Sequence, residues 1–476
     1  MRATEAAAPR QRGAALLVLM LVVVIAGLAV LGRGVSRRVG DDSIDHRSMT
    51  AMAAAKDALI GYAATHVDRM PGEYAFLPCP DTGTTGDEGL EDAANCGAAN
   101  RNVIGRLPWK TLGLPPMPGG HHECLWLAVS GAYKNGSNKT AMLNADTRGQ
   151  FEVFAADAGF YLAGPIPGDR AVAVLFAPGA VRTGQNRAPL GSSVEHCGGN
   201  YNVAAYLDAD GGIDNATVTN SPDAIDQFIN GAEPGANDRI LTITRRELED
   251  AYFARSDAGP ALIAMATAVA ECIADYGRKN PAGVTDTRLP WPAPVNLTDY
   301  RVNAEYNDSP VGILSGRVPD TVNDSNTHTN NPITNVLVNC DSAAVPTWTA
   351  TTALLWSQWK DHLFYAVSDS FKPDAPTPNA CGGCLSVDGT ATLAGIVLLA
   401  GRALDVLGQV RDASPLDPDT RDDIRNYLEG RNASNHPDTT GTADYETATA
   451  SSSFNDVLVC IDDDLSVFPC TDAAGH

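Results

Sequence analysis

The sequence has few basic residues. It contains 34 Lys and Arg against 57 Asp and Glu, which gives a formal net charge of −23 over 476 residues. The excess acid is spread along the chain, so no basic surface for nucleic acid or for anionic membranes is expected. This acidic balance suits a secreted protein that meets calcium.

Familiar catalytic motifs are also missing. The chain has no G-x-S-x-G, H-E-x-x-H or phosphate-binding glycine loop, and its Ser, His and Asp residues show no triad spacing. His121-His122-Glu123 suggests a transition metal. However, adjacent side chains in a strand point to opposite faces, so a surface turn after Gly119-Gly120 is favoured. The sequence therefore predicts no enzyme.

No cysteine precedes Cys79, and the ten cysteines from Cys79 onward point to an oxidising compartment. The expected pairing is sequential, with Cys79–Cys96, Cys381–Cys384 and Cys460–Cys470 favoured because their loops are short. Cys381-Gly382-Gly383-Cys384 could be a redox motif or half a zinc site. It lies in a loop rich in Pro, Asn and Gly, and no second C-x-x-C occurs, so a structural disulfide is favoured. The remaining candidates are Cys124, Cys197, Cys272 and Cys340.

Proline is absent between Pro9 and Pro71, which leaves room for a long helix. The apolar run Ala14–Leu31 would span roughly 27 Å as a helix, just enough for a bilayer core. A secretory signal cleaved near Gly27 and Ala29, or a simple signal anchor, would also explain the run.

A second helical pattern follows the apolar run. In residues 41–67, apolar side chains recur at spacings near three and four, with charged residues between them. This pattern predicts an amphipathic helix that continues from the membrane run. Its apolar positions are Ile44, Met52, Ala55, Leu59 and Tyr62.

Gly13 stands between a basic leader and the apolar run, and this start resembles type IV pilins and type II secretion pseudopilins. The resemblance implies cleavage after Gly13 by a prepilin peptidase and N-methylation of Ala14. Residues 14–67 would form the pilin helix, with 14–31 transmembrane. Family members usually carry a glutamate at the fifth mature position, which is Val18 here. That glutamate is thought to pair with a neighbour's α-amine, and buried charges are tolerable only when paired. The chain therefore resembles the large minor subunits of the filament tip.

The resemblance also implies a location and partners. The chain would cross the inner membrane once, with a periplasmic head, and would reach the tip of a pilus or pseudopilus after assembly. Its partners would be other minor pilins or pseudopilins, the prepilin peptidase and the inner-membrane assembly platform. Its role would be to initiate assembly or to contact cargo or a surface. The alternative is a secreted disulfide-rich binding module or adhesin with an ordinary signal peptide.

The region after the helix contains six collinear pairs of similar segments, which indicate an internal repeat. The predicted fold is α+β: the N-terminal helix, then two tandem pilin-like heads over 68–255 and 256–476. Each head would place a helix on an antiparallel sheet, the second helix covering 258–278. The pairs are 58–60 with 261–263, 77–80 with 289–292, 126–130 with 364–368, 172–176 and 184–185 with 395–399 and 408–409, 206–207 with 427–428, and 237–241 with 455–459.

Two acidic loops are candidates for calcium, the only cofactor that the sequence suggests. Asp208, Asp210 and Asp214 alternate around Gly211-Gly212, as oxygen ligands do in calcium loops, although the glutamate of an EF-hand is replaced by Thr219. A solvated acidic turn is the favoured interpretation of this loop. The second loop, between Cys79 and Cys96, contains Asp81, Asp87 and Glu91.

Overall fold

The computed structural model describes most of the chain after the N-terminal run. The described residues are 43–84, 86–155, 160–189, 196–231, 235–279, 287–310, 312–322, 336–337, 340–375, 381–389, 393–411 and 420–471. The predicted processing residues Gly13 and Ala14, the fifth mature position Val18 and the apolar run Ala14–Leu31 lie outside them.

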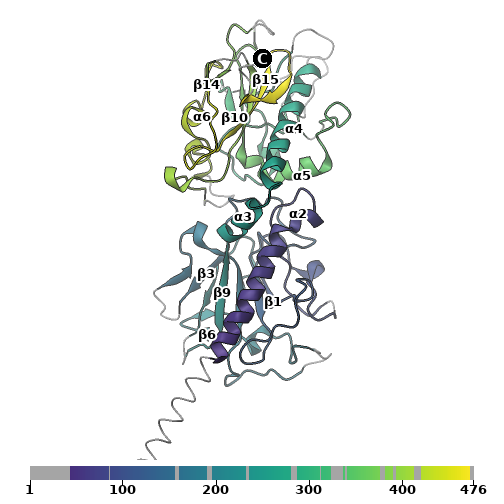
Figure 1. Cartoon of the computed structure of the whole chain (residues 1–476), viewed down its shortest axis with the longest axis vertical. Coiled ribbons are helices and arrows are strands. Elements are labelled where there is room, and N and C mark those ends of the chain that lie inside the picture. The colour runs from purple at the N-terminus through teal and green to yellow at the C-terminus, as the bar shows by residue number, and fades with distance from the viewer. Residues whose placement is uncertain are drawn as a thin grey trace, which may run out of the picture.

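The described chain is a mixed α and β structure in which two halves stack along the long axis of the molecule (Figure 1). Each half contains one main sheet, and most strand pairs are antiparallel. The first sheet has the order β1-β2-β5-β3-β4, with β8 beside β3 and β9 beside β5. Its strands are β1 (Val103–Arg106), β2 (Trp126–Val129), β3 (Phe151–Phe154), β4 (Tyr161–Ala163), β5 (Ala171–Ala177), β8 (Asp226–Ile229) and β9 (Arg239–Thr244).

A long helix over residues 43–64 crosses the first sheet (Figure 1). Of the predicted apolar positions, Met52, Ala55 and Leu59 are buried, whereas Ile44 and Tyr62 are partly exposed. Lys56 donates from Nζ to the carbonyl of Thr242 in β9 at 2.8 Å, which fixes the helix against that strand. A short helix, α2 (His66–Arg69), follows it near the boundary between the halves.

Two consecutive helices follow β9: α3 (Arg245–Phe253) closes the first half, and α4 (Ala258–Lys279) opens the second. Thr244 and Glu247 form a reciprocal capping box that starts α3 at the end of β9. α4 packs on β13, β15 and β16 of the second sheet, close to the predicted helix 258–278. That sheet contains β10 (Ser315–Arg317), β11 (Leu363–Val367), β13 (Leu393–Leu399), β15 (Val457–Asp462) and β16 (Val467–Pro469) in this order.

The two sheets share the register of the first two strands in their order. Arg106 pairs with Trp126 between β1 and β2, and Arg317 pairs with Phe364 between β10 and β11. Each arginine also lies over a tyrosine ring, at 5.3 Å from Tyr206 in the first half and at 5.3 Å from Tyr427 in the second. The segments 126–130 and 364–368, and the pairs at 206 and 427, therefore occupy matching positions.

Hydrogen bonds to side chains in the first half also have counterparts at matching positions of the second half. The backbone N–H of Asp208 donates to Asp238 at 2.6 Å, and that of Glu429 donates to Asp456 at 3.0 Å. Three further side-chain bonds have a match in the other half. The bond from Gln185 to Asp208 matches that from Gln409 to Glu429, the bond from Asn215 to Ile229 matches that from Asn432 to Glu446, and the bond from Arg187 to Tyr206 matches that from Arg411 to Tyr427.

Two of the sequence pairs need correction. Trp126 faces Phe176 across the sheet, whereas Phe364 faces Leu398, so residues 172–176 match 394–398 rather than 395–399. Leu77 and Leu289 make the same backbone hydrogen bond, to Tyr133 and Phe371 respectively. Leu59, in the helical triplet 58–60, lies 18 residues before Leu77. Leu262, in the triplet 261–263, lies 27 residues before Leu289. Because the two spacings differ, the triplets do not occupy equivalent positions of the repeat. Short apolar triplets of this kind recur by chance along helices.

Both faces of the central strands β2, β5, β11 and β13 are buried. Leu127 and Val129 face the helix side of the first sheet, and Trp126 and Ala128 face a separate core beneath loops. This explains why the strands are continuous apolar runs in the sequence. The core on the helix side runs through both halves without a break. Five disulfides reinforce the described chain and confirm sequential pairing: Cys79–Cys96, Cys124–Cys197, Cys272–Cys340, Cys381–Cys384 and Cys460–Cys470.

Candidate functional site

The surface where the two halves meet, here called the junction, has an aromatic centre. Trp359 at the end of α5 (Ala350–Trp359) is buried, with its ring 5.5 Å from that of Tyr74 and 6.0 Å from that of Phe253. Trp359 meets each of the two rings edge to face, an arrangement that aromatic pairs prefer. Tyr74 and Phe253 belong to the first half, so these contacts hold the second half against it.

Polar contacts surround this aromatic centre. Asn144 of the first half donates from Nδ2 to the carbonyl of Gln358 and to Oδ1 of Asp361, both at 2.8 Å. Gln358 in turn accepts from the backbone N–H of Leu143 at 2.5 Å. All of these groups are buried, so each lost hydrogen bond would leave a polar atom without water.

His362 lies between carboxylates from both halves. Its Nε2 is 3.0 Å from Oδ2 of Asp146, and its Nδ1 is 3.1 Å from Oδ1 of Asp361. Burial opposes the charge of His362, but the two carboxylates raise its pKa. Burial likewise opposes the charge of Asp146 and Asp361, but His362 holds the pKa of both below the usual range, together with Arg411 at Asp146 and Arg421 at Asp361.

The same three side chains could be considered as metal ligands, because their ligand atoms lie within 4.8 Å of one another. Arg421 bonds directly to Oδ2 of Asp361, and Arg411 lies 3.7 Å from Oδ2 of Asp146. Both carboxylates thus already face a guanidinium cation, whose charge opposes the binding of a metal cation beside it. The donor set therefore fits a buried ion network better than a metal site.

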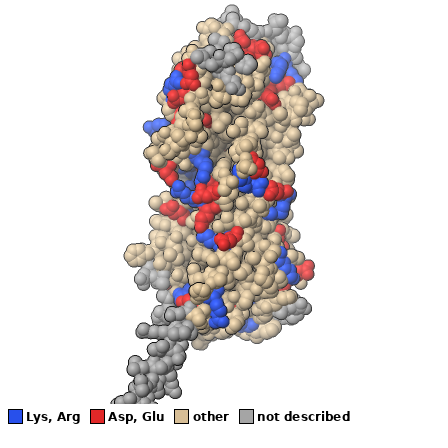
Figure 2. Space-filling view, in the orientation of Figure 1, with Lys and Arg blue, Asp and Glu red and all other residues tan. Residues whose placement is uncertain are grey.

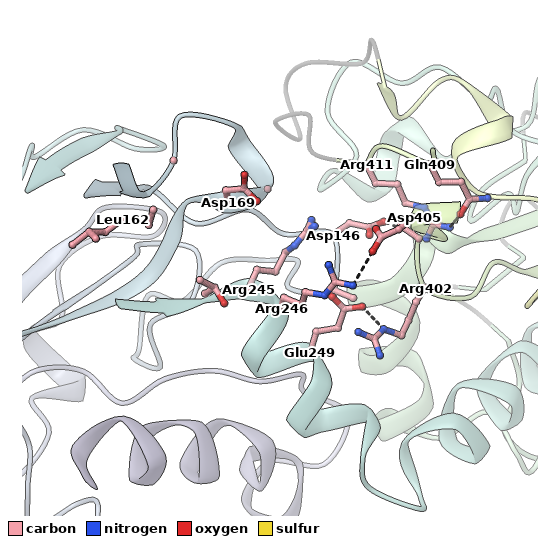
Figure 3. Close-up of a pocket in the computed structure, with 16 residues that line it drawn as sticks. Asp146, Leu162, Asp169, Arg245, Arg246, Glu249, Arg402, Asp405, Gln409 and Arg411 are labelled. Carbon is pink, nitrogen blue, oxygen red and sulfur yellow. Dashed lines mark hydrogen bonds and ion pairs between the residues drawn. The ribbon is translucent and has the colours of Figure 1, made fainter. Parts of the chain in front are cut away.

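A cleft of about 480 Å³ opens beside this network and is lined by both halves (Figure 3). Arg246 of α3 pairs with Asp405 at 2.8 Å, and Arg402 pairs with Asp250 at 2.6 Å and with Glu249. Acidic and basic side chains accordingly gather across the middle of this face of the molecule (Figure 2). The charges pair across the junction, so the cleft has no strong field of one sign.

The predicted calcium loops do not gather their carboxylates. Asp208 is buried and accepts from Gln185 and from the backbone N–H of Asn237, while Asp214 caps its own turn at Ala216. Among the described residues, neither these side chains nor Asp210 form a group of three convergent metal-ligating atoms.

The second acidic loop likewise uses its carboxylates internally. Asp81 accepts from Gly83, Gly89 and Tyr201, and Glu91 accepts from the backbone of Cys79. Asp87 is exposed. The structure thus gives calcium no support at either loop, and calcium stays a prediction.

The other motifs singled out in the sequence lie apart from the junction. His121 and His122 are exposed in a turn, and His122 has a φ of 63°. Cys381 and Cys384 form a disulfide in a loop of the second half. The junction residues carried no local signal, because Asp146 is separated from Asp361 and His362 by about two hundred residues and meets them only through packing of the halves.

Comparison with protein-family models, with curated proteins and with solved structures finds no match for this chain. Within the described ranges, α4 is the one helix that is long and apolar enough to cross a membrane. In the structure, 61% of the apolar window of α4 is buried, and α4 packs on the second sheet. Its apolar composition is therefore explained as well by a place in the core as by a membrane span.

Proposed function

We propose that the chain is a minor pilin or pseudopilin that ends a type IV pilus or a type II secretion pseudopilus. The observation that carries the proposal is the helix over residues 43–64, which continues in sequence from the apolar run Ala14–Leu31 and packs along an antiparallel sheet. A signal peptide or a simple anchor needs no such packed continuation. The leader ending at Gly13 supports the same proposal.

A position at the filament tip is supported by two features. Val18 provides no carboxylate to neutralise the amine of a neighbouring subunit in the membrane. The second half adds a second helix-on-sheet head, whose helix α4 is joined to α3 rather than to a membrane run. A bulky second head of this kind is easier to place at an end than at every position along a shaft. In this proposal the partners are other minor pilins or pseudopilins, the prepilin peptidase and the inner-membrane assembly platform.

Mass spectrometry of the mature N-terminus tests the proposal. A chain that begins at a methylated Ala14 supports a pilin-type subunit. A chain that begins near Val30 would instead identify a secreted binding module or adhesin with an ordinary signal peptide. Placement at the tip is tested separately with Val18→Glu, which should insert in the membrane but change its ratio to the other minor subunits in isolated filaments. An unchanged ratio would count against the tip.

A further inference from the structure

The second half has a hollow on its surface that is lined mostly by apolar side chains and has a volume of about 430 Å³. Three prolines contribute to its wall, Pro292, Pro294 and Pro437, together with Ile424 and the carboxylate of Asp422. This cavity is here called the proline hollow. Small-molecule sites in proteins commonly have this size, an apolar wall and a few polar groups.

Asp422 takes the position that Tyr201 holds in the first half. The matched arginines of β1 and β10 each donate to the carbonyl of the preceding residue, which is Asn200 in the first half and Arg421 in the second. Each position also lies five residues before the tyrosine that stacks on that arginine. The repeat therefore places an aromatic residue in one half where the other half has an acid.

In the first half, the ring of Tyr201 fills the surface at this position. Its hydroxyl donates to Oδ2 of Asp81 at 3.0 Å. Asp81 forms an isolated bridge with β1, as Ala293 does with β10. The counterparts of both partners, Asp422 and Ala293, line the proline hollow. The first half therefore places its own tyrosine at a position beside which the second half is hollow.

Another ring replaces only part of what Tyr201 does. Tyr201 lies 5.1 Å from the guanidinium of Arg106, and Tyr300 lies 4.8 Å from that of Arg317. Tyr300 is fully buried and does not line the proline hollow. It takes over the contact with the arginine, but the space at the exposed Asp422 stays unfilled.

The polar groups around the hollow accept hydrogen bonds. Asp422 forms no hydrogen bond or ion pair with another described residue, whereas the neighbouring Asp423 pairs with Arg425 at 2.7 Å. Asp422 therefore leaves one negative charge uncompensated at the wall. A ligand that carries a cation would pair with this carboxylate without breaking an existing ion pair.

His436 adds a second acceptor nearby. It lines an adjoining hollow of about 630 Å³ that shares Asp422 and Ile424 with the proline hollow. The side chain is 8% exposed, its Nδ1 lies 3.0 Å from the carbonyl oxygen of Asn432, and its Nε2 has no hydrogen-bond partner in the described chain. Since Nδ1 carries the proton, Nε2 offers a lone pair to a donor.

From the open position, the apolar wall and the uncompensated carboxylate, we infer that the proline hollow binds a small molecule that combines an aromatic ring with an ammonium group. The ring packs on the prolines and Ile424, which removes its apolar surface from water, and the ammonium group pairs with Asp422. The inference does not depend on the proposed pilin function and would hold equally for a secreted binding module.

Isothermal titration calorimetry of the full-length chain in detergent tests the inference, with tyramine as the probe and detergent alone as the blank. Tyramine joins a phenol ring to an amine that is protonated at neutral pH. It should bind saturably, with a Kd of about 1 mM or tighter. Ethylamine lacks the ring and p-cresol lacks the ammonium group, so each should bind about tenfold more weakly or worse.

Three variants locate the site. Asp422→Asn removes the charge with little change of shape and should weaken tyramine binding about tenfold or more. Asp422→Tyr introduces the residue of the first half, so its ring should occupy the hollow and abolish binding in a protein that still melts cooperatively. Asp463→Asn is the matched control, because Asp463 is an exposed carboxyl of the second half that does not line the hollow, and it should bind as the wild type does.

Four outcomes would overturn the inference. They are a wild type that does not bind tyramine saturably, ethylamine or p-cresol binding as tightly as tyramine, Asp422→Asn binding no more weakly than Asp463→Asn, and a folded Asp422→Tyr that binds as the wild type does. If Asp422→Tyr does not fold, the comparison of the two asparagine variants decides, because both replace an exposed carboxyl.

Discussion

At the scale of single residues, His362 makes the stability of the junction depend on pH. The pKa of His362 is raised by the charges of Asp146 and Asp361, although burial opposes this. Its stabilising contribution is therefore complete below its unfolded value of about 6.5 and is lost as the pH rises through the folded pKa. The pKa of each carboxyl is lowered, so their contributions are complete above about pH 4 and are lost as the pH falls. The network should stabilise the chain most between about pH 4 and pH 6.5.

His362→Gln tests this dependence. The free energy of unfolding in urea should be lower in the variant at about pH 6 by roughly 3 kcal/mol, because two buried carboxylates lose their shared cation. The difference should shrink as the pH rises and the wild-type histidine loses its proton. The pKa of the neighbouring Lys360 is lowered by burial to about 8, but this lysine is present in both proteins and cancels in the difference. A difference that stays constant from pH 6 to about pH 9 would contradict a charged His362.

The pKa of Asp238 is shifted in the opposite direction to that of Asp146 and Asp361. Burial raises its pKa to about 7, even though the backbone N–H of Asp208 donates to it. Its folded pKa lies above the unfolded one, so the stabilisation is complete below about pH 4 and is lost as the pH rises through 7. In Asp238→Asn, the stability measured from about pH 4 to pH 8 should fall less steeply than in the wild type, by up to about 4 kcal/mol over the range. The control is Asp463→Asn, at an exposed carboxyl, which should leave the slope of stability against pH as it is in the wild type. If Asp238→Asn also keeps the wild-type slope, the pKa of Asp238 is not raised.

At the scale of elements, close approaches of the backbone decide where glycine is needed. A Cβ on Gly316 in β10 would lie 2.2 Å from the carbonyl oxygen of Ala293, whereas one on Gly61 in the helix over 43–64 would meet nothing within 4 Å. Gly316→Ala should lower the free energy of unfolding by about 1–3 kcal/mol, because the strand must shift. Gly61→Ala should raise it by about 0.5–1 kcal/mol through helix propensity. Thermal melts of the two variants should therefore move in opposite directions, and a shift in the same direction would contradict the packing around Gly316.

The sequence anticipated the elements whose signals are local. The apolar repeat segments 172–176 and 364–368 lie in β5 and β11, whose two faces are both covered. α3 was missed, although Thr244 and Glu247 carry the capping-box spacing that could have indicated it. β4 was missed as well, because a strand of three residues is too short to show a periodic pattern in the sequence. The junction could not be predicted, because Asp146 and His362 come together only after both halves have folded.

At the scale of the whole molecule, the core on the helix side passes through the junction. Residues of both halves, including Leu248 and Trp356, belong to this single core. Arg255 adds an ion pair to Asp68 at 2.7 Å, between the segment that joins α3 to α4 and α2 of the first half. The halves should therefore unfold together, although each has its own sheet.

Trp359→Ala tests whether the junction couples the two halves. Removing a buried tryptophan costs about 3–5 kcal/mol, and here the loss falls on the contacts with Tyr74 and Phe253. Differential scanning calorimetry should show one transition for the wild type and two for the variant, since each sheet keeps its own second core. Trp126→Ala is the matched control, because Trp126 is equally buried but lies in the far core of the first half. It should lower the first half's stability by a similar amount, and the transition should remain single as long as the junction is intact. A single transition in Trp359→Ala would mean that the covalent link through α3 and α4 couples the halves without the aromatic contacts.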